Sequence, residues 1–298
     1  MHLTQDSVWL VALVHDRGGL RVVAQAHETL DPERWADALP GFLQKKVPAG
    51  GSLHISLAPS FYSLLLVDSP AVPESELREA ARWRIRDLVT QPLDSLVVDV
   101  FALPEDAFRG RNNMIYAAAT EKTLMRRLSA LHTDRYPLHD VGVQELALVK
   151  AAVRLPGVGR SGIALLSMEH SSGGIHLCEN GQLYLSRAVD FSTRDAADAA
   201  AIEGRVDRLA LDVQRSLDYY ESQIGKTPPG RLLWFGSEAI GETFIQSLQS
   251  RVSVECVAAD LEKIVEWPEP AAPEHQLCWA SALGAAMGGE EGNVLATN

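Results

Sequence analysis

The segment from Arg205 to Leu248 most constrains how this chain folds. Apolar residues between Val206 and Ile224 recur at helical spacing, which predicts a long amphipathic helix. A short apolar strand at Arg231–Phe235 follows, and then the dipeptide Gly236-Ser237 predicts a tight turn before a second helix. A buried strand that ends in glycine before a helix exposes backbone N–H groups, which suit a phosphate or a nucleoside. This turn has a single glycine, Gly236. The sequence therefore predicts the backbone shape of a nucleotide-binding site with few of the residues that bind a nucleotide.

The composition limits the classes of partner and site. The chain has 298 residues and a net charge of −12. An acidic surface repels nucleic acid and anionic lipid, so we expect no nucleic acid and no direct membrane insertion. The apolar runs are shorter than the about 20 residues of a membrane span, and the N-terminus has no signal-peptide pattern. Cys178, Cys256 and Cys278 are far apart, which indicates a reducing compartment and no metal site.

The first half of the chain predicts a hairpin followed by helices and further strands. The apolar stretches Val8–His15 and Leu20–Glu28 flank the turn sequence Asp-Arg-Gly-Gly, a strong hairpin signal. Thr120 is in the position of a helix N-cap. The remaining predicted elements are a helix at Pro32–Lys45, a helix that starts at Pro73, and strands at Leu53–Pro59, Tyr62–Ser69, Leu96–Leu103 and Met114–Thr120.

The second half repeats this plan without repeating the sequence. A linker at Leu155–Gly159 separates the halves. The second half opens with a three-stranded meander over Ile163–Val189 and ends with a helix near Cys278–Met287. Both halves therefore read as a meander, helices, more strands and a closing helix. We predict lobes at residues 1–154 and 160–288, and a flexible tail at 289–298.

Three segments carry a resemblance to a known family. They are the helix, proline turn and strand of Glu74–Phe101, the pair Leu211–Gln223 and Gly230–Leu248, and the closing helix Ala280–Met287. In this order they resemble the PilM family of type IV pilus assembly proteins, and MshI of the MSHA pilus in particular. The resemblance implies an α/β fold: a two-lobed actin-like (ribonuclease H-like) fold with an extra subdomain at about 40–118 of the first lobe.

The resemblance also implies a function. A protein of this kind is a cytoplasmic component of a pilus assembly machine, held at the inner membrane through a partner and beside the assembly ATPases. The implied partner is the N-terminal peptide of a PilN-like inner-membrane protein, with an apolar-Asn-Leu-Leu core. We expect this peptide in a first-lobe groove between the hairpin Val8–Glu28 and the segment Leu53–Phe101. The expected contact residues are Phe61, Tyr62, Val8 and Leu10.

The positions at which an actin-like fold holds ATP and magnesium are degenerate in this chain. The Asp-Gly loop of the first lobe would fall before Val8, where there is no glycine and almost no room for a strand. Ser167 and Glu169 stand where the second lobe needs Asp-x-Gly. Ser167 offers no charge to magnesium, and Glu169 puts a negative side chain where phosphate approaches. With one glycine left at Gly236-Ser237, we expect no catalytic residue and no cofactor, with weak ATP binding left open.

Two functional alternatives remain. One is an active actin-like or sugar-kinase-like ATPase, which the degenerate loops argue against. The other is the cytoplasmic part of a GspL-like type II secretion protein. A GspL protein continues into a membrane helix, whereas this sequence ends without one.

Two clusters have competing interpretations. Arg78, Arg82 and Arg86 with Trp83 form either a docking site for an acidic partner or a solvated helix face, and an ordinary helical charge spacing favours the solvated face. His176 and Cys178 lie close to His170 and Glu169 in the sequence. Because no recognised metal-ligand spacing is present, we expect them to be structural.

Overall fold

The structure is a computed structural model, and the chain forms two compact units. Unit 1 comprises Met1–Leu103, Arg111–Ala147 and Ser281–Asn298, and unit 2 comprises Pro104–Gly110 and Leu148–Ala280. The predicted lobes were continuous, whereas each unit here takes a segment from the other half of the sequence. The structure describes residues 1–16, 19–31, 35–47, 50–107, 114–158, 162–168, 173–189, 199–236, 241–271 and 275–288.

A mixed five-stranded sheet is the frame of unit 1, in the order β3-β2-β1-β4-β8. Strands β1, β2 and β3 form an antiparallel meander, and β4 and β8 continue the sheet in parallel. The predicted hairpin is confirmed by β2 and β3. The sequence left almost no room for a strand before Val8. The structure has one there, β1, which is very short. The bounds are β1 His2–Leu3, β2 Ser7–Asp16, β3 Gly19–Thr29, β4 Leu53–Leu57 and β8 Leu138–Val143.

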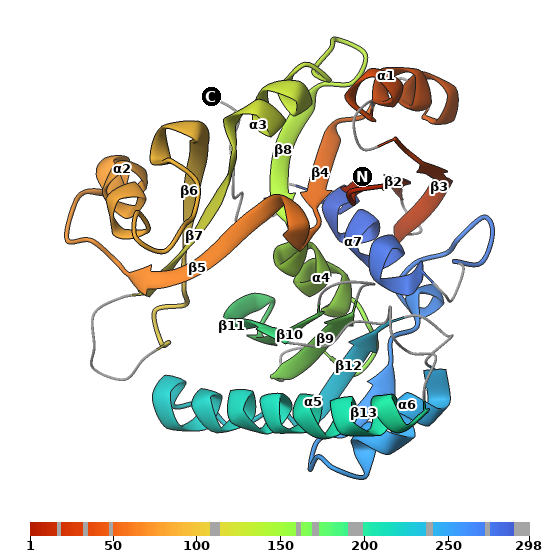
Figure 1. The fold of residues 1–298 in the computed structure, drawn as a ribbon. Helices are drawn as coiled ribbons and strands as arrows, with labels where there is room; N and C mark the ends of the chain where they lie inside the picture. Colours follow the sequence, from red (N-terminus) through yellow and green to blue (C-terminus); the bar gives the residue numbers. More distant parts are fainter. Residues whose placement is uncertain are drawn as a thin grey trace. The chain divides into compact units, whose positions relative to one another are not determined.

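An inserted subdomain lies between β4 and β8 in the sequence (Figure 1). It is an antiparallel sheet in the order β5-β7-β6, and helix α2 packs on β6. Strand β4 itself belongs to the five-stranded sheet, so the insertion begins after Leu57 rather than near residue 40. Its elements are β5 Tyr62–Asp68, α2 Glu74–Arg84, β6 Leu96–Ala102 and β7 Met114–Glu121, with short 3₁₀ turns at Pro59–Phe61 and Leu93–Ser95.

Two arginines of α2 hold the inserted subdomain together. Arg78 Nε lies 2.7 Å from the buried Asp99 carboxylate on β6, and Arg82 donates a hydrogen bond of 2.6 Å to the Leu93 carbonyl. Arg86 pairs with its neighbour Asp87. Arg78 and Arg82 therefore fix α2 to its own subdomain, which a simple solvated face does not describe, and the docking interpretation stays a prediction.

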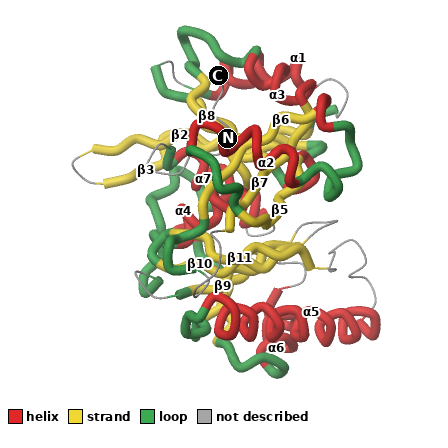
Figure 2. Tube along the Cα trace, turned by 90° about the vertical axis from the view of Figure 1, so that its left-hand side faces the viewer, coloured by secondary structure: helices red, strands yellow, loops and turns green. Residues whose placement is uncertain are grey.

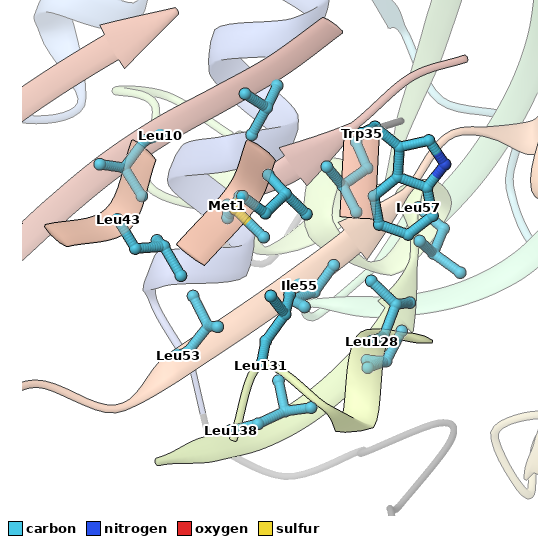
Figure 3. Close-up of a cluster of buried hydrophobic side chains, with 14 of the residues drawn as sticks. Met1, Leu10, Trp35, Leu43, Leu53, Ile55, Leu57, Leu128, Leu131 and Leu138 are labelled. Carbon is cyan, nitrogen blue, oxygen red and sulfur yellow. The ribbon is translucent and has the colours of Figure 1, made fainter. Parts of the chain in front are cut away.

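The main core of unit 1 joins helices α1 (Trp35–Lys46) and α3 (Lys122–Ser129) to the five-stranded sheet. Figure 3 shows side chains from the N-terminus, α1, β4, β8 and α3 converging on this core. Thr120 does not cap α3 as predicted: the N-cap is Glu121, without a side-chain cap bond. The Thr120 hydroxyl instead donates to the Phe61 carbonyl at 2.7 Å, because Thr120 is still a strand residue of β7 opposite Tyr62.

Unit 2 repeats the strand pattern of unit 1, in the order β11-β10-β9-β12-β13. Its predicted meander and long amphipathic helix are confirmed. Helix α5 lies against α6 and β11 (Figure 2) and continues as a π-helix over Tyr220–Ile224. Helices α4 (Gln144–Ala152) and α7 (Gln276–Ala286) each contribute residues to both units. The bounds in unit 2 are β9 Ile163–Met168, β10 Gly173–Glu179, β11 Gln182–Val189, α5 Ala199–Tyr219, β12 Arg231–Phe235, α6 Gly241–Gln249 and β13 Glu255–Ala258.

Among the helices of the described residues, none is long and apolar enough to cross a membrane.

Strand β12 is the buried centre of the parallel part of the unit 2 sheet. It pairs in parallel with β9 on one side and with β13 on the other. Trp234 and Phe235 are 4% and 0% exposed, which confirms the burial predicted from the apolar run. The Trp234 ring packs against Phe244 of α6, with 5.5 Å between ring centroids.

Replacement of Trp234 by alanine should destabilise the protein strongly. The change removes a buried indole from between the sheet and α6, and such truncations cost about 3–5 kcal/mol. Chemical denaturation followed by circular dichroism measures the loss of unfolding free energy. A loss below about 1 kcal/mol would show that the indole does not support this core.

Candidate functional site

The candidate site is a pocket of about 320 Å³ within unit 1. It opens where the first residues of β5 meet the end of β7 and the first turns of α3. The wall contains the predicted residues Phe61 and Tyr62, together with Thr120, Leu124, Arg127 and Trp35 of α1. The hairpin β2–β3, which we expected to form one side of the groove, does not line this pocket.

Tyr62 is held in place by the residues that follow β8. Its hydroxyl donates to the carboxylate of Glu145, which is 6% exposed, and accepts a bond of 3.2 Å from the backbone N–H of Gln144. The Tyr62 hydroxyl gives the buried Glu145 carboxylate a hydrogen-bond donor. A buried carboxylate with such a donor costs less free energy than one without. The ring of Tyr62 is thereby fixed as a preformed wall.

The pocket is lined by apolar and polar side chains in similar measure. Trp35 and Leu124 are buried, whereas Glu121, Thr123 and Arg127 are exposed. Among the strands that the structure describes, β5 is at the edge of its sheet and pairs with β7. An edge strand presents backbone N–H and C=O groups to an incoming extended segment. The pocket and the strand edge together suit an extended peptide with apolar side chains.

Two of the expected contact residues are in the core instead. Val8 and Leu10 are 0% and 3% exposed, so their side chains cannot contact a peptide. The prediction for them was wrong because β2 is an inner strand, paired with β1 on one side and β3 on the other. Sequence reasoning missed Thr120, Leu124 and Arg127 as pocket residues: it assigned Thr120 to a helix N-cap and gave the other two residues no role in a site.

In unit 2, Ser167 occupies the expected magnesium position, and its hydroxyl forms hydrogen bonds within its own sheet. Ser167 donates to the Gly174 carbonyl at 3.3 Å and its Oγ lies 2.9 Å from His176 Nε2. His176 Nδ1 lies 3.0 Å from the Ser186 hydroxyl. Burial lowers the pKa of His176 to about 4, so the ring is neutral at neutral pH. These bonds occupy the Ser167 hydroxyl, which therefore does not suit a metal-bound nucleotide.

The metal interpretation of His176 and Cys178 does not fit the described geometry. The Cys178 thiol faces the Ile163 carbonyl at 3.7 Å, whereas the His176 ring lies between serines. Burial raises the pKa of Cys178 to about 12, which keeps the thiol protonated. Glu169 and His170 lie outside the described residues.

The glycine that ends β12 provides room for a side chain of the protein itself. A Cβ atom at Gly236 would lie 2.1 Å from the Trp234 indole, so this glycine allows the indole to pack there. We expected Gly236 to belong to a turn that holds a nucleoside. Packing of the Trp234 indole explains the glycine at this position. Ser237 lies outside the described residues.

The loop at the first expected phosphate position is short and closed on itself. It joins β1 to β2 through Thr4, Gln5 and Asp6, without a glycine. The Thr4 hydroxyl donates to Asp6 at 3.0 Å, and the Thr4 N–H donates to the Ser7 carbonyl at 3.0 Å. The backbone N–H of Thr4 is therefore already satisfied within the turn.

Comparisons with known proteins give the fold. No protein-family model and no curated protein matches the chain. A chain of the PilM-PilN type IV pilus biogenesis complex is similar over 96% of this chain and 96% of that chain, with a TM-score of 0.73 and 17% identity. This chain has the actin-like ATPase fold. The predicted two-lobed architecture and the resemblance to PilM are confirmed at the level of fold.

Two further structures are similar. A protein of Bacteroides thetaiotaomicron with an actin-like ATPase fold and unknown function covers 95% of this chain and 93% of its own, with a TM-score of 0.55 and 13% identity. The cytoplasmic domain of EpsL, an inner membrane component of the type II secretion system of Vibrio cholerae, reaches a TM-score of 0.48 at 16% identity over 95% and 92% of the chains. The EpsL similarity is too loose to distinguish one function from another.

The buried His176 should make stability depend on pH. Its pKa is lower in the folded state, about 4, than the 6.5 of an exposed histidine, so the unfolded chain binds the proton more tightly. The contribution is complete above about pH 6.5 and is lost as the pH falls towards 4. Relative to His176→Asn, the wild type should lose about 2 kcal/mol more between about pH 7 and pH 5. Equal losses in urea denaturation would contradict the neutral buried ring.

Proposed function

We propose that this protein is a non-catalytic actin-like scaffold of a type IV or MSHA-type pilus assembly machine. Its role is to bind the N-terminal peptide of a PilN-like inner-membrane protein in the pocket of unit 1. The peptide would hold the protein at the cytoplasmic side of the inner membrane, beside the assembly ATPases.

The pocket next to edge strand β5 is the observation that carries the proposal. An extended peptide needs backbone partners for its own N–H and C=O groups and a recess for its apolar side chains. Strand β5 supplies an edge on which no other described strand pairs, and Trp35, Phe61 and Leu124 line the recess. A solved structure that is similar over 96% of both chains comes from the PilM-PilN type IV pilus biogenesis complex.

The non-catalytic part of the proposal rests on the nucleotide positions. ATP hydrolysis in this fold needs a carboxylate for the metal and open backbone N–H groups for the phosphates. The Ser167 hydroxyl is bonded within its own sheet, and the indole of Trp234 packs on Gly236. Neither residue fits a metal-nucleotide complex.

A binding experiment on the full chain tests the peptide site. A fluorescent peptide with an apolar-Asn-Leu-Leu core is titrated with wild type, Thr123→Arg and Ser129→Arg. Thr123 is exposed on the pocket wall, whereas Ser129 is exposed on the same helix away from the pocket. We expect Thr123→Arg to weaken binding at least about tenfold, because an arginine fills the recess, and Ser129→Arg to bind like the wild type. Affinity should change little with salt, because apolar burial drives binding.

Two results would overturn the proposal. Equal binding by Thr123→Arg and wild type would place the peptide elsewhere. A second experiment, calorimetric titration with ATP and magnesium, tests the non-catalytic part of the proposal. We expect weak or no binding of ATP. A dissociation constant near or below about 1 μM would favour the active ATPase instead.

A further inference from the structure

Three metal-ligating side chains converge at the beginning of strands β4 and β8. His54, His139 and Asp140 present ligand atoms that all lie within 4.8 Å of one another. His54 Nδ1 is 2.7 Å from Asp140 Oδ2, and His139 Nδ1 is 3.7 Å from the same oxygen. The two imidazole rings are 5.1 Å apart between centroids. All three residues belong to unit 1.

A β-bulge brings the third ligand to this cluster. Leu53 is paired with Leu138, but the next residue, His54, is paired with Asp140. His139 is therefore an extra residue in β8. In a regular strand, neighbouring side chains point to opposite faces, so His139 and Asp140 would diverge. Bulges are rare between parallel strands and re-aim side chains, and this one brings both residues beside His54.

The three side chains differ in their exposure to solvent, as the ligands of a metal site with an entry path do. The side chains of His54 and Asp140 are 9% and 12% exposed, whereas that of His139 is 55% exposed. Two ligands are thus held by the sheet and the third lies at the surface, which gives an ion an entry path. The backbone of Gly288 approaches the His54 ring so closely that a Cβ atom there would lie 2.7 Å from it. The orientation of His54 is consequently fixed.

Ser52 allows His54 to change its tautomer. Its hydroxyl lies 2.9 Å from His54 Nε2, on the opposite side of the ring from Asp140. A hydroxyl can donate to this nitrogen or accept from it. With the proton on Nδ1, His54 donates to Asp140. With the proton on Nε2, His54 donates to Ser52 and leaves Nδ1 free to bind a metal. A metal-bound histidine typically donates its other ring N–H to such a partner.

We infer that His54, His139 and Asp140 form a binding site for a zinc ion. Two imidazoles and one carboxylate are ligands that Zn²⁺ accepts, with water in the fourth position of a tetrahedron. Ligand bonds of about 2.0–2.2 Å separate neighbouring ligand atoms by about 3.4 Å. The distance between His139 and Asp140 is near this value, and a small rotation of the Asp140 carboxylate opens the shorter contact to His54.

A zinc ion at this site would cross-link the starts of β4 and β8. These two strands frame the inserted subdomain, since the whole insertion lies between them in the sequence. The ion would therefore stabilise unit 1 in proportion to its occupancy, because a ligand that binds the folded state shifts the folding equilibrium. The site does not include any residue of the peptide pocket, so it is independent of the proposed function.

The test is a zinc titration of the full chain, free of affinity tags, in competition with a coloured chelator. Wild type is compared with His139→Ala, which changes an exposed side chain, and with His15→Ala, which removes an exposed histidine elsewhere. We expect one zinc ion per chain in wild type and in His15→Ala, and affinity weakened more than about tenfold in His139→Ala. Zinc should also raise the thermal unfolding midpoint of wild type but not of His139→Ala.

Asp140→Asn provides a second variant with nearly unchanged shape, and it should weaken zinc binding in the same way. Equal zinc affinity in wild type and His139→Ala would overturn the site. A loss in His15→Ala as large as that in His139→Ala would assign the binding to surface histidines in general, and absence of binding by wild type would overturn the site as well.

Discussion

The parallel pairing of β4 with β8 is the constraint on which the rest of unit 1 depends. Two parallel neighbours cannot be joined by a tight turn, so the chain must cross back before it enters the second strand. In this protein the crossover contains the inserted sheet and helices α2 and α3. The pairing thereby brings Tyr62, just after β4, within hydrogen-bonding distance of Glu145, just after β8. At the other end of the same two strands it brings His54 beside Asp140.

Unit 2 has the same strand order but uses its strand ends differently. Unit 1 has a pocket beside its inserted sheet, whereas in unit 2 the residues at two strand ends contact other side chains of the protein. The Trp234 indole lies against Gly236, and the Ser167 hydroxyl completes a chain of polar contacts through His176. Gly236 makes room for the Trp234 indole, and Ser167 bonds within its own sheet.

Much of the fold could be predicted from local signals. The alternating stretches of β2 and β3 and the apolar run of β12 are short-range patterns, and the predicted strands are confirmed. Strand β8 was missed because His139, Asp140 and Gly142 make it polar and flexible on its own, and only pairing with β4 makes it a strand. The pocket could be predicted only in part: Phe61 and Tyr62 stood out as an aromatic pair beside a strand. Val8 and Leu10 failed because sequence alone does not tell an inner strand from an edge strand.

Hydrogen–deuterium exchange with and without the apolar-Asn-Leu-Leu peptide tests most directly the claim that unit 1 is a peptide-binding module. If the peptide pairs with the edge of β5 and fills the adjacent recess, exchange should slow at Tyr62–Asp68 and in the first turn of α3, because newly bonded amides are protected. Exchange in unit 2 should stay unchanged around Ser167 and Trp234. Protection confined to another edge strand, such as β3 or β13, with none at β5, would contradict the account.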